Sequence, residues 1–348
     1  MKKLPQLTTL ELVHCRVTDA GLAHVNDLRK LTYLNLTTTR VTDAGLRALK
    51  GLRLLDTLDL SVTRVTGTGL AELSHLESLR TVDLTHAETT DDDLGAIKQL
   101  PRLTTLILNH TAVTDAGLTE LRSHPGLTAL YLKGDAVTDI GMAELNRILQ
   151  LTELHLSGTK VTDAGVKGLK DLKRLSFLNV SGTSVGDGAL ATLTAHPKLA
   201  VLNLSGTKVT DAGMTHLKEM PSLTTLDLSD TDLTDAALPP LTALRQLKLL
   251  SLTETQVTDA GMAEIKKLGQ LTGLALSLTK VTDAGVAELK GLQRLDTLEL
   301  RVTRVSDAAL PTLKGFRKLR YLELTQTRIT PAGVQELLAA LPDCVIIK

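Results

Sequence analysis

The chain has no tryptophan and only three tyrosines and two phenylalanines in 348 residues, so its core has to be built from aliphatic side chains. It also has no excess of charge of either sign, because Lys plus Arg and Asp plus Glu both total 39. A neutral chain argues against a protein whose affinity comes from neutralising phosphates. We therefore expect no nucleic-acid partner.

Cysteine and long apolar runs are also scarce. The two cysteines, Cys15 and Cys344, lie near opposite ends of the chain, and a disulfide would need their Cα atoms within about 7 Å of each other. No apolar run approaches the roughly 18 residues of a membrane span, and residues 1–5 contain no signal-peptide stretch. These absences favour a reducing compartment, so we expect a cytoplasmic protein with no membrane partner.

What the chain does have is a strict repeat. A leucine opens a Leu-x-x-Leu-x-Leu-like segment every 24 residues, at Leu7, Leu31, Leu55, Leu79, Leu103, Leu127, Leu151, Leu175, Leu199, Leu223, Leu247, Leu271, Leu295 and Leu319. This leucine is position 1 of each repeat. Repeat arrays lengthen without forming new cores. We predict a single solenoid over residues 1–348, with a truncated half-repeat at 1–6, fourteen repeats at 7–342 and a terminal strand at 343–348.

Each position in the repeat has a predicted task. Apolar positions 4 and 6 share the core face of a short strand, and positions 3, 5 and 7 face solvent. Thr at position 9, in eleven of fourteen repeats, is expected to bond neighbouring backbone with its hydroxyl. Thr at position 12 and Asp at position 13 predict a helix N-cap and a charge that suits the helix dipole. Pro239 and Pro311 predict two late or irregular helices.

The spacing resembles the leucine-rich-repeat superfamily, and the phrase Val-Thr-Asp-Ala-Gly-Leu resembles short bacterial repeats common in planctomycete proteins. The segment His14-Cys15-Arg16-Val17-Thr18-Asp19 is similar to the cysteine-containing repeat subclass. The resemblance implies an α/β horseshoe with a concave parallel β-sheet and short helices on the convex side. For function it implies protein interaction.

The two ends of the array differ. The chain opens in the tail of a repeat, because Leu4-Pro5-Gln6-Leu7 matches the repeat joint at 100–103. A solenoid needs polar caps for solubility, so we expect either a fragment or a preceding domain. The end at 341–348 has the pattern of a natural terminus.

The charged residues at the exposed strand positions are mostly acidic, with only Lys133 and Arg301 basic. The acids at positions 3, 5, 7 and 8 are Glu11, Asp59, Asp83, Glu153, Asp227, Asp230, Glu254, Glu299 and Glu323. The basic residues at position 10 form a rim of opposite sign: Arg16, Arg40, Arg64, Lys160, Lys208, Lys280, Arg304 and Arg328. This pattern is either ordinary solvated surface or a field that steers a partner with a basic element.

Aromatic placement points to a candidate binding surface. Four of the five aromatics, Tyr33, Tyr131, Phe177 and Tyr321, stand at solvent-facing positions, and Phe316 is at a core position. Aromatics on one face are typical of binding anchors, although cross-strand packing is an alternative. The predicted partner-binding residues are Ile107, Tyr131, Lys133, Glu153, His155, Phe177, Asn179, Val201 and Asn203.

Two further groups have weaker claims to function. His86 and His110 occupy position 8 of adjacent repeats, with Glu88 and Asp135 nearby. Zinc binding is possible for such a set, but a pair of surface histidines without metal is the commoner case. The run Asp91-Asp92-Asp93 stands at a predicted helix start, where capping explains it better than calcium. Gly at position 8 of four successive repeats is expected to serve a turn.

The glycines and acidic residues recur at fixed positions of the repeat. They form no recognisable nucleophile–base pair, phosphate-binding glycine loop or catalytic carboxylate pair. We therefore expect no enzyme, no cofactor and no small-molecule substrate. The leading hypothesis is a recognition module that binds a protein or peptide on the β-face. The alternative is a structural or spacer solenoid without a single ligand. A glycan or small-molecule receptor would need a deeper pocket than an open sheet offers.

Overall fold

A computed structural model describes residues 4–348 of the chain, so residues 1–3 of the predicted half-repeat lie outside the described part. The chain forms two compact units, Met1–Leu175 and Ser176–Lys348. Each unit is built from the 24-residue repeat, and whether they act as one domain stays a prediction.

Within each unit, three-residue strands pair in parallel in the order of the chain, and partner residues are 24 apart, as in Leu10 and Leu34. In the first unit the strands are β1 (Thr9–Glu11), β2 (Tyr33–Asn35), β3 (Thr57–Asp59), β4 (Thr81–Asp83), β5 (Thr105–Ile107), β6 (Ala129–Tyr131) and β7 (Glu153–His155). In the second they are β8 (Phe177–Asn179), β9 (Val201–Asn203), β10 (Thr225–Asp227), β11 (Leu249–Ser251), β12 (Gly273–Ala275), β13 (Thr297–Glu299), β14 (Tyr321–Glu323) and β15 (Val345–Ile347).

Short α-helices and 3-10 helices (η) return the chain from one strand to the next. The first unit has α1 (Asp19–Leu22), η1 (Ala23–Val25), α2 (Asp43–Leu46), η2 (Arg47–Gly51), α3 (Gly67–Ala71), η3 (Asp91–Gln99), α4 (Asp115–Leu121), α5 (Asp139–Leu145) and α6 (Asp163–Gly168). The second has α7 (Asp187–Leu193), η4 (Gly213–Glu219), η5 (Asp235–Ala237), η6 (Pro239–Ala243), η7 (Asp259–Gly261), α8 (Met262–Ile265), α9 (Asp283–Glu288), η8 (Leu289–Gly291), η9 (Asp307–Ala309), α10 (Leu310–Leu313) and α11 (Pro331–Ala340).

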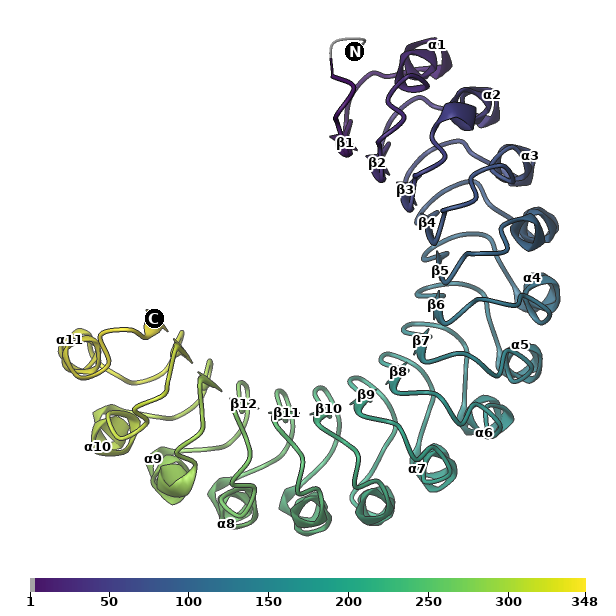
Figure 1. The fold of residues 1–348 in the computed structure, drawn as a ribbon. Helices are drawn as coiled ribbons and strands as arrows, with labels where there is room; N and C mark the ends of the chain where they lie inside the picture. The colour runs from purple at the N-terminus through teal and green to yellow at the C-terminus, as the bar shows by residue number, and fades with distance from the viewer. Residues whose placement is uncertain (1–3) are drawn as a thin grey trace. The chain divides into compact units, whose positions relative to one another are not determined.

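In each unit the strands line one side and the helices the other (Figure 1). The predicted fold class, an α/β repeat solenoid with a parallel sheet and short helices, is confirmed. No helix within residues 4–348 is both long and apolar enough to cross a bilayer.

The core lies between the strands and the helices and is aliphatic, as predicted. In the repeat that begins at Leu151, that residue, Leu154 and Leu156 are all fully buried. Each such leucine contributes about 1.5–3 kcal/mol through the apolar area that it removes from water. Phe316 is buried at 1% exposure, as its core position predicts.

The threonine at position 9 has the predicted role. The Thr159 hydroxyl donates to the Leu156 carbonyl at 2.7 Å, and the same bond recurs in the other repeats that have a buried threonine here, such as Thr255 with Leu252. In these repeats a buried hydroxyl therefore satisfies a carbonyl at the end of the strand.

The aspartate at position 13 does much more than complement a helix dipole. Asp139 accepts two hydrogen bonds from the next repeat, from the Thr162 backbone N–H at 2.7 Å and from its hydroxyl at 2.6 Å. Thr162 in turn caps α6 by accepting the Ala164 N–H, as predicted. The same two bonds are made by the carboxylates of Asp19, Asp43, Asp91, Asp115, Asp139, Asp187, Asp211, Asp235, Asp259, Asp283 and Asp307. We call this set the aspartate ladder.

The ladder also explains the glycine of the Asp-Ala-Gly phrase. A Cβ added at Gly141 would lie 2.5 Å from the Asp115 Oδ1 of the preceding repeat, and one at Gly285 would lie 2.3 Å from the Asp259 Oδ1. The carboxylate thus occupies the space that a side chain at position 15 would need. Ala189, Ala237 and Ala309 show that some repeats make room for one methyl group.

One irregular repeat shows that the ladder constrains the sequence. Gly67 stands where the aspartate should be, and Asp93 replaces the glycine at position 15 of the next repeat. The Asp93 carboxylate reaches back to accept the Gly67 N–H at 2.6 Å, and also the Thr90 N–H at 2.7 Å. At this joint the carboxylate is therefore supplied by the later repeat instead of the earlier one. This contact confirms the capping explanation for the aspartate run at 91–93.

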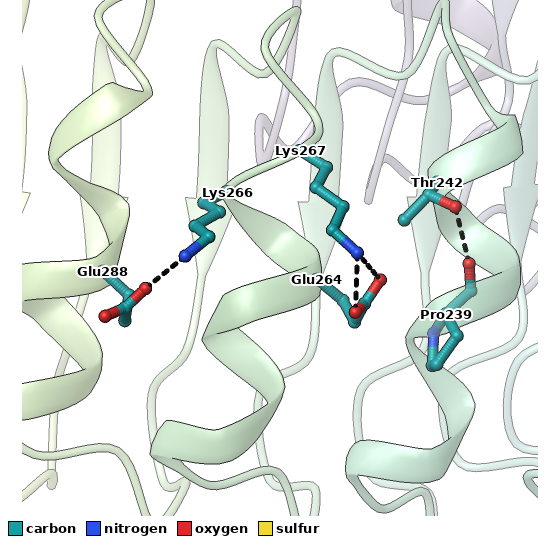
Figure 2. A network of polar contacts seen from close by, with 6 residues as sticks. All are labelled: Pro239, Thr242, Glu264, Lys266, Lys267 and Glu288. Atoms are coloured by element: carbon teal, nitrogen blue, oxygen red, sulfur yellow. Dashed lines mark hydrogen bonds and ion pairs between the residues drawn. The ribbon is translucent and has the colours of Figure 1, made fainter.

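The two proline-containing helices are irregular, as predicted: η5 and η6 replace an α-helix around Pro239, and η9 precedes α10 around Pro311. In η6 the Thr242 hydroxyl donates to the Pro239 carbonyl at 2.7 Å (Figure 2). Between neighbouring repeats on this side, Lys266 pairs with Glu288 at 2.6 Å (Figure 2). Such exposed pairs contribute little to stability.

We predict that Asp259→Ala lowers the free energy of unfolding by about 2 kcal/mol, because two hydrogen bonds to a charged acceptor are lost. Urea denaturation followed by circular dichroism measures this change. The control is Glu288→Ala, which removes only an exposed ion pair and should cost less than about 0.5 kcal/mol. Equal effects of the two substitutions would contradict the role given to the ladder.

Candidate functional site

The first unit carries a compact aromatic cluster on its sheet face. Ile107, Tyr131 and His155 stand side by side at position 5 of β5, β6 and β7. The rings of Tyr131 and His155 are stacked, with centroids 3.9 Å apart and planes at 12°. All three side chains are half-buried, so the aromatics predicted to face solvent lie on the exposed face but pack against their neighbours.

Glu153 fixes both rings of this cluster. Its Oε1 accepts the Tyr131 hydroxyl at 2.5 Å and lies 2.8 Å from the His155 Nε2. Burial, followed by the bond to Glu153, raises the pKa of Tyr131 well above its usual value. The phenol therefore stays protonated as a donor and is no activated nucleophile. We name Ile107, Tyr131, Glu153 and His155 the tyrosine cluster.

Lys133 and the histidine pair flank the tyrosine cluster. Lys133 is exposed two residues after Tyr131, and its backbone N–H donates to the Asn109 Oδ1 at 2.9 Å. His86 and His110 stack with ring centroids 4.7 Å apart and planes at 7°. Burial, His86 and Lys133 all lower the pKa of His110, which favours the neutral form of the His110 ring. Within residues 4–348 no group of three or more His, Cys, Asp or Glu side chains is arranged to hold a metal ion.

The predicted residues of the second unit form a separate pair of rows on β8 and β9. Phe177 is in register with Val201, and Asn179 with Asn203. The Asn179 Oδ1 accepts the Ser181 N–H and the Asn203 Oδ1 accepts the Ser205 N–H, both at 2.9 Å. The two asparagines therefore have a structural role that sequence reasoning missed. Phe177 and Val201 present the apolar surface here.

The same turn changes the interpretation of the acidic stripe. The acids at position 5 were predicted to be ordinary solvated surface or part of a steering field, but several of them also have a structural role. The Asp83 carboxylate accepts the Thr85 N–H at 2.8 Å and its hydroxyl at 2.6 Å. The other acids that cap position 7 in this way are Asp59, Asp227 and Glu323. In the sequence, this capping role is indicated by an acidic residue at position 5 followed two residues later by Ser or Thr at position 7.

Position 8 is left-handed in every repeat. The four glycines predicted to serve a turn have φ between 63° and 73°, which confirms that prediction. The other ten repeats adopt the same conformation with side chains present, including Val62 at φ 54° and Val302 at φ 55°. A β-branched residue is strained there. At position 134 a side chain is also excluded by space, because a Cβ added at Gly134 would lie 2.3 Å from the His110 Nδ1.

Asp135 replaces the usual threonine at position 9 and is 3% exposed. Its Oδ1 accepts the Thr111 N–H at 2.7 Å, while its buried Oδ2 has no partner among the described residues. Burial raises the pKa of Asp135 to about 7. The protonated form can donate a hydrogen bond, as the threonine hydroxyl does in other repeats.

Comparison with known proteins identifies the repeats. A leucine-rich-repeat family model matches residues 5–65, and a second one matches residues 150–170, 195–217, 219–238 and 317–338. These segments are leucine-rich repeats. A comparison with curated proteins finds no match.

Solved structures show the same fold. An internalin from Listeria monocytogenes is 22% identical, with a TM-score of 0.67 over 92% of this chain and 88% of that one. A leucine-rich-repeat protein from Leptospira interrogans is 22% identical, with a TM-score of 0.64 over 99% and 82%. A structure described as a TDR receptor is 16% identical, with a TM-score of 0.55 over 99% and 68%. The fold is that of the leucine-rich-repeat α/β class.

We predict that Asp135→Thr stabilises the protein, and more so at pH 8 than at pH 5. The folded pKa of about 7 lies above the unfolded value of 3.8. Burying the carboxyl therefore costs nothing below pH 3.8, and the cost grows until pH 7. With 1.36 kcal/mol per unit, the two pH units between pH 5 and the folded pKa make the gain from Asp135→Thr larger at pH 8 by about 3 kcal/mol.

Urea denaturation at the two pH values measures this gain. Thr159→Ala is the control, because it changes the equivalent position without a titratable group and its effect should not depend on pH. A gain for Asp135→Thr that is the same at both pH values would show that the Asp135 carboxyl is ionised in the folded protein.

Proposed function

We propose that the chain is a non-enzymatic interaction module that binds a protein or peptide on the exposed face of its β-sheet. The observation that carries this proposal is the tyrosine cluster, in which Glu153 and His155 hold the Tyr131 ring on the exposed face. Leucine-rich repeats generally mediate protein–protein interaction. The resemblance of the repeat to bacterial ones, including the planctomycete-like phrase, agrees with the two bacterial structural neighbours.

The tyrosine cluster has the physical properties of a binding anchor. Ring stacking and the bond to Glu153 hold Tyr131 in one orientation before a partner arrives. An ordered side chain loses little entropy on binding, whereas a mobile one costs about 0.5–1.5 kcal/mol. Ile107 extends the apolar surface on one side, and Lys133 supplies a charge. In the second unit, Phe177 and Val201 give the sheet face of that unit an apolar surface of its own.

Charge supports a partner with a basic element. Glu11, Asp230 and Glu254 are exposed acids of the sheet face, and the eight basic residues of the position-10 rim are all exposed as well. A partner with basic residues over the sheet and acidic residues over the rim would match both stripes. Long-range steering of this kind weakens as salt is added.

We predict that Tyr131→Ala and Phe177→Ala each leave the chain folded, with a loss of about 1 kcal/mol in unfolding free energy from lost aromatic packing. Each should weaken partner binding by about 2 kcal/mol or more if the ring is an anchor. Circular dichroism with urea denaturation measures the first quantity. Loss of the fold would show that the rings are core residues.

Affinity capture from a lysate of the source organism tests binding. Wild type, Tyr131→Ala and Phe177→Ala are compared with Tyr33→Ala, a tyrosine on the sheet face of β2 outside the tyrosine cluster. A protein retained by wild type and Tyr33→Ala but lost by Tyr131→Ala supports the proposal. If no variant retains a protein above background, the spacer hypothesis is the better account.

A further inference from the structure

The second unit has a hollow in its sheet face that the tyrosine cluster does not touch. It has a volume of about 290 Å³ and lies over β10 to β13. Its floor is β12, where Gly273 stands at position 3 and Ala275 at position 5. No other repeat has a glycine at position 3 or an alanine at position 5. The hollow therefore exists because β12 has the smallest outward side chains in the array.

Leu249 forms an apolar wall of this hollow. It is in register with Gly273 on β11 and is 44% exposed, which is unusual for a leucine in this chain. Its Cδ2 lies 2.7 Å from the place where a Cβ of Gly273 would be. The leucine thus leans over the bare backbone of β12. A ligand group that contacts this wall has to be apolar where it touches Leu249.

Glu299 forms the opposite wall. It is half-buried on β13, in register with Ala275 on one side and Glu323 on the other. Burial, followed by the neighbouring Glu323 charge, raises the pKa of Glu299, and no cation contributes. The Arg301 charge acts on Glu323 instead, which also accepts the Tyr321 hydroxyl and the Thr325 N–H. Among residues 4–348, the Glu299 carboxylate therefore has no compensating positive charge.

The acid at the far end of the hollow is already satisfied. Asp227 on β10 accepts the Ser229 N–H and hydroxyl through Oδ1, and the Asn203 amide through Oδ2 at 3.1 Å. The hollow is therefore asymmetric, with apolar surface in the middle and one uncompensated carboxylate at the β13 side.

We propose that this hollow takes an arginine or lysine side chain of the bound partner. The aliphatic stem lies on Leu249, Gly273 and Ala275, and the cationic head pairs with Glu299. Arginine and lysine combine an apolar stem with a charged head, and this is the arrangement of surfaces that the hollow offers. An acidic ligand group would be repelled by Glu299 and Glu323, and a neutral apolar one would bury Glu299 without compensation.

This inference rests on the proposed function and assigns one chemical group of the partner, but it is tested with a small probe. N-acetyl-arginine amide is titrated into the full-length protein at low salt, and the methyl groups of Leu249 and Ala275 are followed by NMR. We expect both methyl signals to shift and saturate. N-acetyl-citrulline amide, which has nearly the same shape without the charge, should bind about tenfold more weakly or not at all.

Two variants separate the charge of the hollow from its shape. Glu299→Gln removes the charge, and Gly273→Thr fills the floor with the residue found at the same position of β10 and β13. Both should weaken the binding of N-acetyl-arginine amide about tenfold or more. Glu288→Gln, an exposed carboxylate on the helical side of the same unit, should leave binding unchanged. Circular dichroism verifies that each variant is folded.

Three results would overturn the inference: no methyl shift with the arginine probe, equal binding of the citrulline probe, or unchanged binding to Glu299→Gln. The proposed function fails separately. If the arginine probe binds specifically but no protein is captured from lysate, the proposed function fails. The hollow would then remain a binding site for a basic group. A captured protein with no probe binding would place the partner's contacts elsewhere on the sheet.

Discussion

Most repeats are tied to the next by a carboxylate that accepts both polar groups of a single residue. Asp139 with Thr162, and Asp259 with Thr282, show the pattern that recurs along both units. A short strand and a helix of one or two turns cannot bury a core alone, so a repeat is stable only when it is stacked on its neighbours. The ladder holds the helix starts in register, which in turn holds the leucines of one repeat against those of the next. It also favours glycine at position 15, because the carboxylate occupies the space beside that residue.

Most of the fold followed from the period of the sequence. The leucine spacing predicted the strands and the core, and threonine at position 9 predicted a hydroxyl bond to neighbouring backbone, because both are consequences of a single repeat. The aspartate ladder was missed because it joins residues in different repeats, and local rules assign an aspartate at a helix start to capping. Gly67 and Asp93 carried the missing signal. One repeat lacks the aspartate at position 13, and the next repeat has an aspartate at position 15 where glycine is usual. This paired exchange indicates that the two positions lie against each other.

The candidate site was predicted less completely. The residue types and strand positions placed Ile107, Tyr131 and His155 in one row, since parallel pairing with a fixed period sets the register. They could not show that Glu153 bonds both rings, because that depends on side-chain rotamers. They also missed the structural role of Asn179 and Asn203, whose oxygens cap the turn after the strand. The hollow over β12 was overlooked because a search for large and charged side chains passes over Gly273 and Ala275, whose small size creates it.

The ladder is tested most directly by hydrogen exchange of the position-12 amides. The Thr282 N–H lies at a helix start and donates to the Asp259 Oδ1 at 2.7 Å instead of to backbone. If the ladder joins the repeats, this amide should exchange as slowly as the strand amide of Leu274, since both open only when neighbouring repeats separate. Exchange as fast as that of an exposed loop amide would contradict the account. It would mean that the repeats are held together by apolar packing and strand pairing alone.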